Sequence, residues 1–172
     1  MGTDQHFKVL IIGAGSAGIS VAARLRRKGI EGVGLLDPAE QHGYQPLWTL
    51  IGAGCAPAKS GHRPMASLIP KGVDWVRAAA ADVDPEAHTV TTSSGTTIGY
   101  DYLVVCPGIQ LDWDKIPGMA EALKTSSVSS NYDFDLTPRT WSAISGLRSG
   151  TAVFTMPAAP IKCAGAPQKI AY

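Results

Sequence analysis

Apolar and polar positions change their period twice along the first 37 residues, and this change predicts a strand, a helix and a second strand. Lys8–Ile12 is a short apolar run rich in β-branched residues, typical of a strand that is buried on both faces. From Ser16 to about Lys28, apolar residues recur at three- and four-residue spacing, which predicts an amphipathic helix that ends at Gly29. A second strand is expected over 32–36. Together these elements predict one βαβ unit with a right-handed crossover.

Beyond this unit the pattern predicts shorter elements joined by loops. A turn-rich, aromatic segment comes first, and it includes a short helix around 47–51. The elements expected after it are a strand over 73–83, a hairpin turning at Ser94-Gly95, a buried strand over 102–106, a helix over 137–147 and a strand over 151–156. The hairpin is expected to leave the parallel sheet as an excursion.

These elements predict an α/β fold of the Rossmann-like kind, with a parallel sheet, crossover helices and a β-hairpin excursion. At 172 residues the chain is long enough to bury one good core. Residues 1–150 are expected to form one dinucleotide-binding domain. Residues 151–172 are expected to supply the first strand and loop of a second domain, which the chain does not complete.

Composition and charge exclude several classes of partner. The chain has 15 basic and 14 acidic residues and a net charge of +1, so we expect no nucleic-acid partner. Its longest apolar region, 9–23, is interrupted by glycine and serine and is shorter than the roughly 20 apolar residues of a transmembrane helix. The N-terminus lacks the basic segment of a signal peptide. We therefore expect a cytoplasmic globular protein without signal peptide or transmembrane helix.

The cysteines and histidines do not predict a disulfide framework or a metal site. The three cysteines are widely spaced and form no CxxC motif. The four histidines show no metal-ligand spacing, so we expect no bound metal. Most of the histidines are expected to be solvated loop residues, although His42 is close enough to the segment YQP to contact a cofactor.

A glycine-rich turn supplies the first candidate site. Residues 13–18 read GAGSAG, which is a GxGxxG motif. The motif directly follows a predicted strand and opens a predicted helix, and Asp37 stands at the end of the next strand, 19 residues after Gly18. A dinucleotide-binding turn requires this context, with an acid about 20 residues onward. The alternative is a glycine turn in an ordinary α/β protein with an incidental aspartate.

Each position in the motif has a physical role in dinucleotide binding. Gly13 permits the tight turn, Gly15 lets backbone N–H groups approach a pyrophosphate, and Gly18 lets the helix pack close to the strand. The phosphates then meet the positive end of the helix dipole. Asp37 would accept hydrogen bonds from ribose hydroxyls and repel a 2′-phosphate, which argues against NADP. The motif alone does not separate FAD from NAD.

Cys163 is the second candidate for chemistry. It follows the predicted strand over 151–156, stands next to Lys162, and precedes a helix expected to begin near Ala166. A helix N-terminus and an adjacent cation both favour the thiolate form of a cysteine. These features fit a nucleophilic or redox thiol. The alternative is an inert small residue in a loop, which is the commoner fate of a lone cysteine.

The order of these features resembles the flavoprotein disulfide reductase superfamily, in which the first domain holds FAD. Four segments are more specific and resemble the sulfide:quinone oxidoreductases, in the branch that includes the mitochondrial enzyme. They are YQPLWTLIGAG, GHRPMASLIP, YDYLVVCPGIQLDWDKIPG and PIKCAGAPQKI. The resemblance covers essentially the whole chain. It implies a flavoprotein that oxidises hydrogen sulfide to a sulfane-sulfur product and passes electrons through FAD to quinone.

The resemblance also implies roles for particular residues. Cys163 matches the redox cysteine beside the flavin, which is one of two in the family. The residues that match cofactor contacts are Gly13, Gly15, Ser16, Ala17 and Gly18 in the phosphate turn, Asp37 at the adenosine ribose, Gln45 in the YQP segment, Ala80 at the adenine, and Gly108 in the turn after YDYLVV.

The chain also departs from the family. Family members are much longer, so the second redox cysteine, most of the quinone pocket and a membrane-associating segment have no counterpart in these residues. Cys106 stands where the family usually has another small residue, and Cys55 stands where a small residue is tolerated, so neither is paired with Cys163. Two alternatives remain: an NAD(P)H:quinone or other pyridine-nucleotide flavoprotein oxidoreductase, and a catalytically incompetent FAD-binding fragment. Peripheral membrane association is expected only for a full-length form.

Overall fold

The computed structural model describes residues 5–156 and 165–171. The chain forms two compact units, each discontinuous in sequence. The first unit comprises the described residues of Met1–His42 and Arg63–Ile109, and the second those of Gly43–His62 and Gln110–Tyr172.

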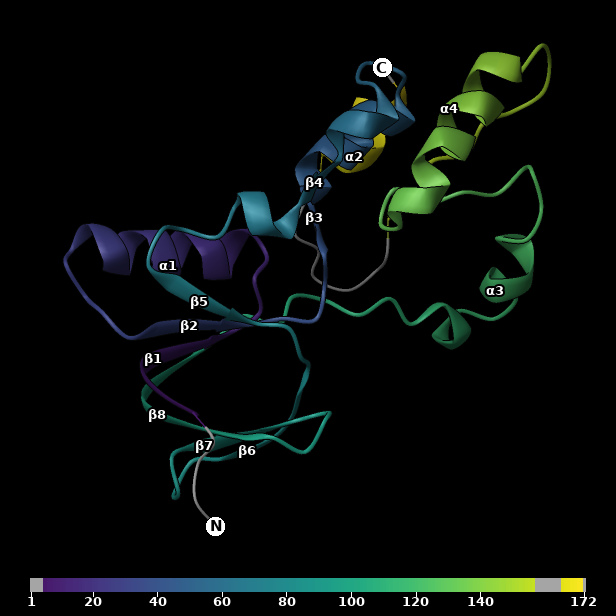
Figure 1. Cartoon of the computed structure of the whole chain (residues 1–172). Helices are drawn as coiled ribbons and strands as arrows, with labels where there is room; N and C mark the ends of the chain where they lie inside the picture. Colours follow the sequence, from purple (N-terminus) through teal and green to yellow (C-terminus); the bar gives the residue numbers. More distant parts are fainter. Residues whose placement is uncertain (1–4, 157–164, 172) are drawn as a thin grey trace. The chain divides into compact units, whose positions relative to one another are not determined.

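The first unit is built on a six-stranded sheet with strand order β5-β2-β1-β8-β7-β6 (Figure 1). Its strands are β1 (Gln5–Ile12), β2 (Val33–Leu36), β5 (Val73–Val76), β6 (Ala80–Asp84), β7 (Thr89–Thr92) and β8 (Thr97–Val105). β1 pairs in parallel with β2 and β8, and β2 pairs in parallel with β5. β7 pairs antiparallel with β6 and β8. The predicted α/β class, with a mostly parallel sheet and a hairpin excursion, is confirmed.

Helix α1 (Ser16–Arg27) connects β1 to β2, as the helical periodicity predicts. Ala22 on this helix is completely buried, and Ile19 and Leu25 pack beside it against the core of the sheet. Three arginines lie in or near the last turn, where positive charge complements the negative end of the helix dipole. Residues 5–36 therefore form the βαβ unit that positions the glycine turn.

The second half of β1, residues 9–12, is buried on both faces of the sheet, which explains its unbroken apolar sequence. Val9 and Ile11 belong to one hydrophobic cluster, together with Val33 of the neighbouring strand. Leu10 and Ile12 alternate with them and belong to a second cluster. Successive side chains of a strand point to opposite faces, so a strand with core on both sides shows no polar alternation.

The single strand predicted over 73–83 is wrong, because this segment forms two strands at opposite ends of the strand order. β5 pairs with β2 at one edge of the sheet, whereas β6 pairs with β7 at the other. The chain leaves the strand conformation at Arg77–Ala79, with a bend at Ala78. Consecutive alanines lack the apolar–polar alternation that would reveal this crossing, and the pairing partners are decided by tertiary structure.

The predicted buried strand over 102–106 is also partly wrong. β8 is one long strand that serves first as an arm of the hairpin and then as the parallel partner of β1. Tyr102 and Val105 are 65% and 61% exposed. β7 pairs only with 97–99, and within the described residues no strand pairs with the rest of β8 on that side. The outer part of this strand is therefore a free edge.

The second unit consists mainly of short helices. They are α2 (Gln45–Gly52), η1 (Ala58–Ser60), η3 (Trp113–Lys115), α3 (Met119–Ala122), η4 (Phe134–Leu136), α4 (Thr137–Gly146) and α5 (Ala166–Ala171). The predicted helices near 47–51, 137–147 and 166 are confirmed, with small differences at their ends. The strand predicted over 151–156 is wrong, because these residues form no strand and are exposed. A strand requires a hydrogen-bonded neighbour, and none is found for them among the described residues.

Aromatic side chains and small residues organise the second unit. The rings of His62 and Phe134 stack with centroids 3.7 Å apart, and Trp48 packs against both. The Trp48 indole N–H donates to the carbonyl oxygen of Gly61 over 3.3 Å. α2 also contacts α4 and α5. Trp48 is therefore half-buried against these two rings.

Short segments connect the units. β3 (Gln41–Gly43) pairs with β4 (His62–Pro64), and the one-turn helix η2 (Met65–Ser67) follows β4. The side chain of Met65 is buried in the core of the first unit. These strands hold the chain segment that includes His42.

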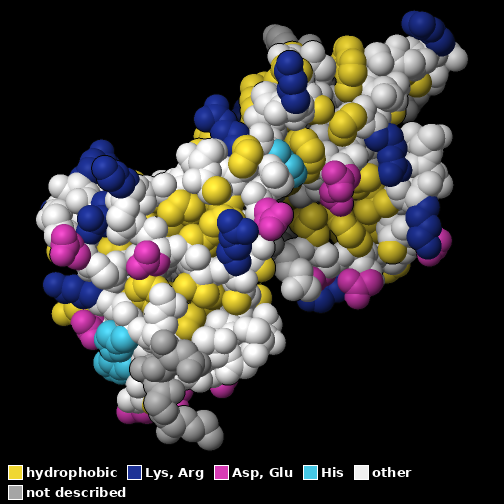
Figure 2. Space-filling model, in the orientation of Figure 1, with side chains coloured by type: hydrophobic (Ala, Val, Ile, Leu, Met, Phe, Trp, Pro, Cys, Tyr) yellow, Lys and Arg dark blue, Asp and Glu magenta, His cyan; other side chains and the backbone are white. Residues whose placement is uncertain are grey.

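The distribution of charged side chains on the surface agrees with the low net charge of the chain. On the face shown in Figure 2, cationic and acidic side chains lie interspersed rather than gathered in patches of one sign.

None of the helices in 5–156 and 165–171 has the length and apolar character that a bilayer crossing requires. His, Cys, Asp and Glu side chains of these residues nowhere gather in a group of three that could hold a metal ion.

Candidate dinucleotide-binding site

The candidate site lies at the carboxyl edge of the parallel strands in the first unit. Because β1, β2, β5 and β8 run in parallel, the segments that follow them meet at this edge. The glycine turn 13–18 follows β1, Asp37 follows β2, Arg77 follows β5, and the segment 106–108 follows β8. Open α/β sheets bind their ligands at this edge.

The turn after β1 is closely packed against the segment after β8. Gly13 has φ +94°, and a methyl group there would collide with the carbonyl oxygen of Cys106. The Cys106 N–H in turn donates to the Ile12 carbonyl oxygen over 2.8 Å. A methyl group at Gly18 would collide with the Gly13 carbonyl oxygen. Glycine is therefore required at both positions for this turn to form.

Gly15 differs from these two glycines because it faces open space. No heavy atom lies within 4 Å of the position that a methyl group would take there. Gly15 is the N-cap of α1, where no side chain forms a cap hydrogen bond and no acidic residue lies in the first turn. Ser16 and Ala17 are exposed. The positive end of the helix dipole and its first N–H groups are thus open to an anion, which fits a pyrophosphate.

The carboxylate of Asp37 ties the segment after β2 to the glycine turn. One of its oxygens accepts a hydrogen bond from the Ala14 N–H over 2.7 Å, and the other accepts from the Ala39 N–H over 2.8 Å. Its backbone is held as well, because the Trp75 indole N–H donates to the Asp37 carbonyl oxygen over 2.9 Å. Asp37 consequently has a structural role in the turn in addition to any role at a ribose.

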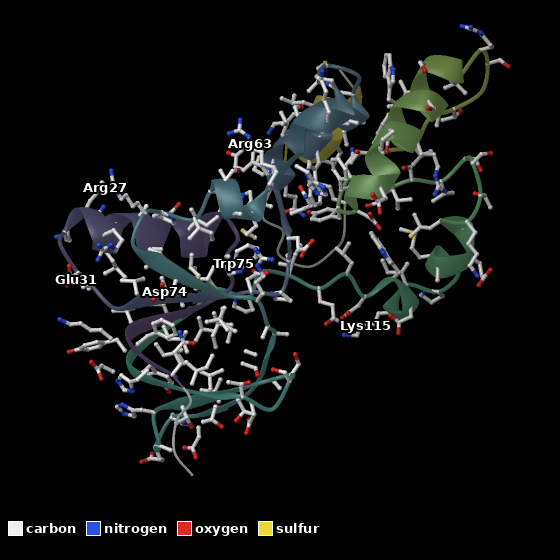
Figure 3. The ribbon with its side chains drawn as sticks, viewed as in Figure 1. Arg27, Glu31, Arg63, Asp74, Trp75 and Lys115 are labelled. Carbon is white, nitrogen blue, oxygen red and sulfur yellow. The ribbon has the colours of Figure 1, made fainter. Side chains whose placement is uncertain are left out.

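A hollow of about 230 Å³ lies in the same unit, against the Trp75 side chain that bonds to Asp37. Trp75, which is labelled in Figure 3, and Arg77 line it, together with Glu40. The Arg77 guanidinium lies 4.4 Å from the centroid of the Trp75 ring and 3.8 Å from the Glu40 carboxylate. Both charged side chains are mostly exposed, so their ion pair contributes little stability. The Trp75 ring nevertheless gives the hollow an aromatic wall.

Some predicted cofactor contacts lie away from the glycine turn in sequence. Ala80 begins β6 in the first unit, and Gly108, with φ +80°, follows β8. Gln45 is the first residue of α2 and belongs to the second unit. Cys163 and Lys162 lie outside the described residues.

The other two cysteines are free thiols. Cys106 is half-buried and directly follows β8. Cys55 is exposed and lies on the wall of an open hollow of about 500 Å³ in the second unit.

His42 has a contact that sequence reasoning does not predict. Its Nδ1 atom lies 3.3 Å from the carbonyl oxygen of Ala14 in the glycine turn. The motif gives no sign of it, because 28 residues separate the two and the approach depends on the pairing of β3 with β4. The sequence indicates only that His42 lies near the YQP segment. Trp75 and its bond to Asp37 are likewise apparent only in the structure.

Comparison with known proteins agrees with this architecture. Residues 7–143 match the family model described as pyridine nucleotide-disulphide oxidoreductase. The chain is 44% identical to a mouse (Mus musculus) protein named sulfide:quinone oxidoreductase, mitochondrial, over 98% of this chain and 38% of that protein. It is 41% identical to a Dictyostelium discoideum protein of the same name, over 96% of this chain and 37% of that protein.

A solved structure gives a similar result. The sulfide:quinone oxidoreductase from Aquifex aeolicus aligns with a TM-score of 0.67 and 28% identity, over 83% of this chain and 32% of that one. The chain thus spans less than two fifths of the length of each of these relatives.

Proposed function

Because the chain belongs to the pyridine nucleotide-disulphide oxidoreductase family, we propose that it is an FAD-dependent oxidoreductase of the sulfide:quinone type. The proposed reaction oxidises hydrogen sulfide to sulfane sulfur and passes the electrons to quinone. The observation that carries the proposal is the 44% identity over 98% of the chain to a protein of that name. The resemblance inferred from the sequence motifs is thereby confirmed. The relatives are much longer, and the activity, substrates and partners remain proposals.

The geometry of the glycine turn supports FAD as the cofactor. The open space at Gly15 and the uncapped start of α1 fit a pyrophosphate. In the proposal, Ser16 and Ala17 donate backbone N–H groups to the phosphates. Each Asp37 oxygen keeps a free lone pair beyond its backbone partner, so the carboxylate can also accept from ribose hydroxyls. Bound FAD would supply the two-electron carrier between sulfide and quinone.

Further contacts are proposed from the family resemblance. Gln45, Ala80 and Gly108 are proposed to contact the cofactor, and Cys163 is proposed as the redox thiol. A cation and a helix start both favour a thiolate, and α5 does begin at Ala166, three residues after Cys163. Peripheral membrane association of longer family members stays a prediction.

An anaerobic absorption experiment tests the proposal. We expect the purified chain, reconstituted with FAD, to show flavin bands that bleach on addition of sulfide and recover with a soluble quinone. Cys163→Ser should abolish the bleaching, whereas the matched variant Cys55→Ser should retain it. Flavin bands that sulfide does not bleach would favour a fragment that binds FAD without turnover.

The same preparation separates the remaining alternative. If NADH bleaches the bands and sulfide does not, the chain is a pyridine-nucleotide oxidoreductase. If sulfide bleaches Cys163→Ser as fast as the unmodified chain, the role proposed for this thiol is wrong.

A further inference from the structure

The backbone of Ala14, in the middle of the glycine turn, is held on both sides by side chains. Its N–H donates to Asp37 Oδ2 over 2.7 Å, and its carbonyl oxygen lies 3.3 Å from His42 Nδ1. Its own side chain is completely buried. A carbonyl oxygen can only accept, so His42 bonds to it with a hydrogen on Nδ1. The backbone of Ala14 is therefore held in place between two flexible glycines.

Fixing the Ala14 carbonyl also fixes the next amide. The Ala14 C=O and the Gly15 N–H belong to one planar trans peptide unit, in which they point in opposite directions. Gly13 and Gly15 flank this unit, and glycine adopts many backbone conformations, so local sequence does little to hold the unit in one orientation. Among the described residues, His42 supplies the side-chain contact that acts directly on this carbonyl.

His42 is itself held in place by backbone pairing. It lies in β3, which pairs with β4. At one end of this pair, the Met65 N–H donates to the Glu40 carbonyl oxygen over 2.8 Å, and the side chain of Met65 is buried in the core. The imidazole therefore approaches the turn from an anchored segment.

We propose that His42 is a positioning residue for the dinucleotide phosphates. Acting through the Ala14 carbonyl, it orients the Gly15 N–H toward the space that no protein atom occupies beside Gly15. The identity of the ligand as FAD rests on the proposed function. The inference that His42 and Asp37 hold the glycine turn in place rests on their contacts with Ala14 and does not depend on the proposed function.

Three variants at His42 show whether its side chain acts as a hydrogen-bond donor or only fills space. Asn places an amide N–H near the position of Nδ1, Gln places it near Nε2, and Leu removes it. The first readout is hydrogen exchange of the peptide covering 13–18 in the flavin-free chain. The second is the FAD dissociation constant from quenching of flavin fluorescence. His6→Gln is the matched control, because His6 is exposed and bonds to Asp101 rather than to the turn.

We expect His42→Gln and His42→Leu to speed exchange in 13–18 and to weaken FAD binding by about three- to tenfold, the effect of one hydrogen bond. His42→Asn should retain the slow exchange and the FAD affinity of the unmodified chain, and His6→Gln should change neither. The proposal is overturned if His42→Gln leaves exchange unchanged, or if Asn restores nothing that Gln removes. If the unmodified chain binds no FAD, the proposed function fails, while the exchange result still decides whether His42 holds the turn.

Discussion

At the scale of single residues, Asp37 already has a backbone partner on each carboxylate oxygen. Ala14 and Ala39 supply the two N–H donors, and Trp75 holds the Asp37 backbone from the neighbouring strand. The acid that the motif assigns to a ribose thus also closes the turn that holds the phosphates. Replacing it should affect folding even when no nucleotide is present.

Asp37→Asn tests this structural role. The variant retains one oxygen acceptor, but its amide NH₂ must face one of the two backbone donors, which leaves that donor unpaired. We expect the flavin-free chain to lose about 1–3 kcal/mol of unfolding free energy in urea titrations. Asp74→Asn, at an exposed position of β5, is the control and should be nearly neutral. Equal stability of Asp37→Asn and the unmodified chain would contradict the structural role.

Gly15 and Gly18 should respond differently to the same small change. A methyl group at Gly18 collides with the Gly13 carbonyl oxygen, whereas at Gly15 it enters open space. We expect Gly18→Ala to lower the thermal unfolding temperature markedly. Gly15→Ala should change stability by less than about 1 kcal/mol, since φ −68° suits alanine, yet weaken FAD binding by crowding the phosphates. Differential scanning fluorimetry and flavin quenching measure the two effects, and equal losses of stability would contradict this division.

At the scale of elements, small residues decide how closely the segments of the second unit approach one another. A methyl group at Gly52, the last residue of α2, would collide with the amide of Asn131. At Gly146, the last residue of α4, it would meet no atom within 4 Å. The two helix ends therefore provide a matched comparison of packing against helix propensity.

We expect Gly52→Ala to destabilise the second unit by about 1–3 kcal/mol, because Asn131 must move out of its packed position. Gly146→Ala should be neutral or stabilising by up to about 1 kcal/mol, because alanine is the better helix former. Urea unfolding followed by tryptophan fluorescence measures both. The packing account is wrong if the two variants have the same unfolding midpoint.

At the scale of the whole molecule, the outer part of β8 carries exposed apolar side chains and, among the described residues, has no pairing strand on one side. Tyr102 and Val105 lie on it, beyond the residues that pair with β7. Exposed apolar edges offer unpaired backbone groups to a second chain, and charged residues, especially lysine, discourage this pairing.

We therefore expect the chain to self-associate as its concentration rises, and Tyr102→Lys to shift it toward monomer. Sedimentation velocity over a hundredfold concentration range measures the change. Leu147→Lys, which replaces another exposed apolar residue away from this strand, is the control and should not alter association. If both lysine variants behave alike, the effect comes from charge and not from the edge.

Much of the fold could be predicted because contiguous residues encode it. The apolar run of β1, the helical spacing of α1, the turn at Gly95 and the start of α4 each depend on neighbours in sequence. The segment 73–83 could not be predicted correctly, because its two strands differ in pairing partner rather than in propensity. The strand predicted over 151–156 was wrong for a similar reason, because strand propensity does not supply a neighbouring strand to pair with.

By itself, the sequence determined that a glycine turn opens a helix after a buried strand, that an acid ends the next strand, and which family the chain resembles. These depend on residue type and short spacing. Only the tertiary structure decided that Asp37 and His42 contact this turn and that Trp75 holds Asp37, over separations of 23 to 38 residues. Such contacts require the strands to pair first, and no local period along the chain specifies which distant residues that pairing brings together.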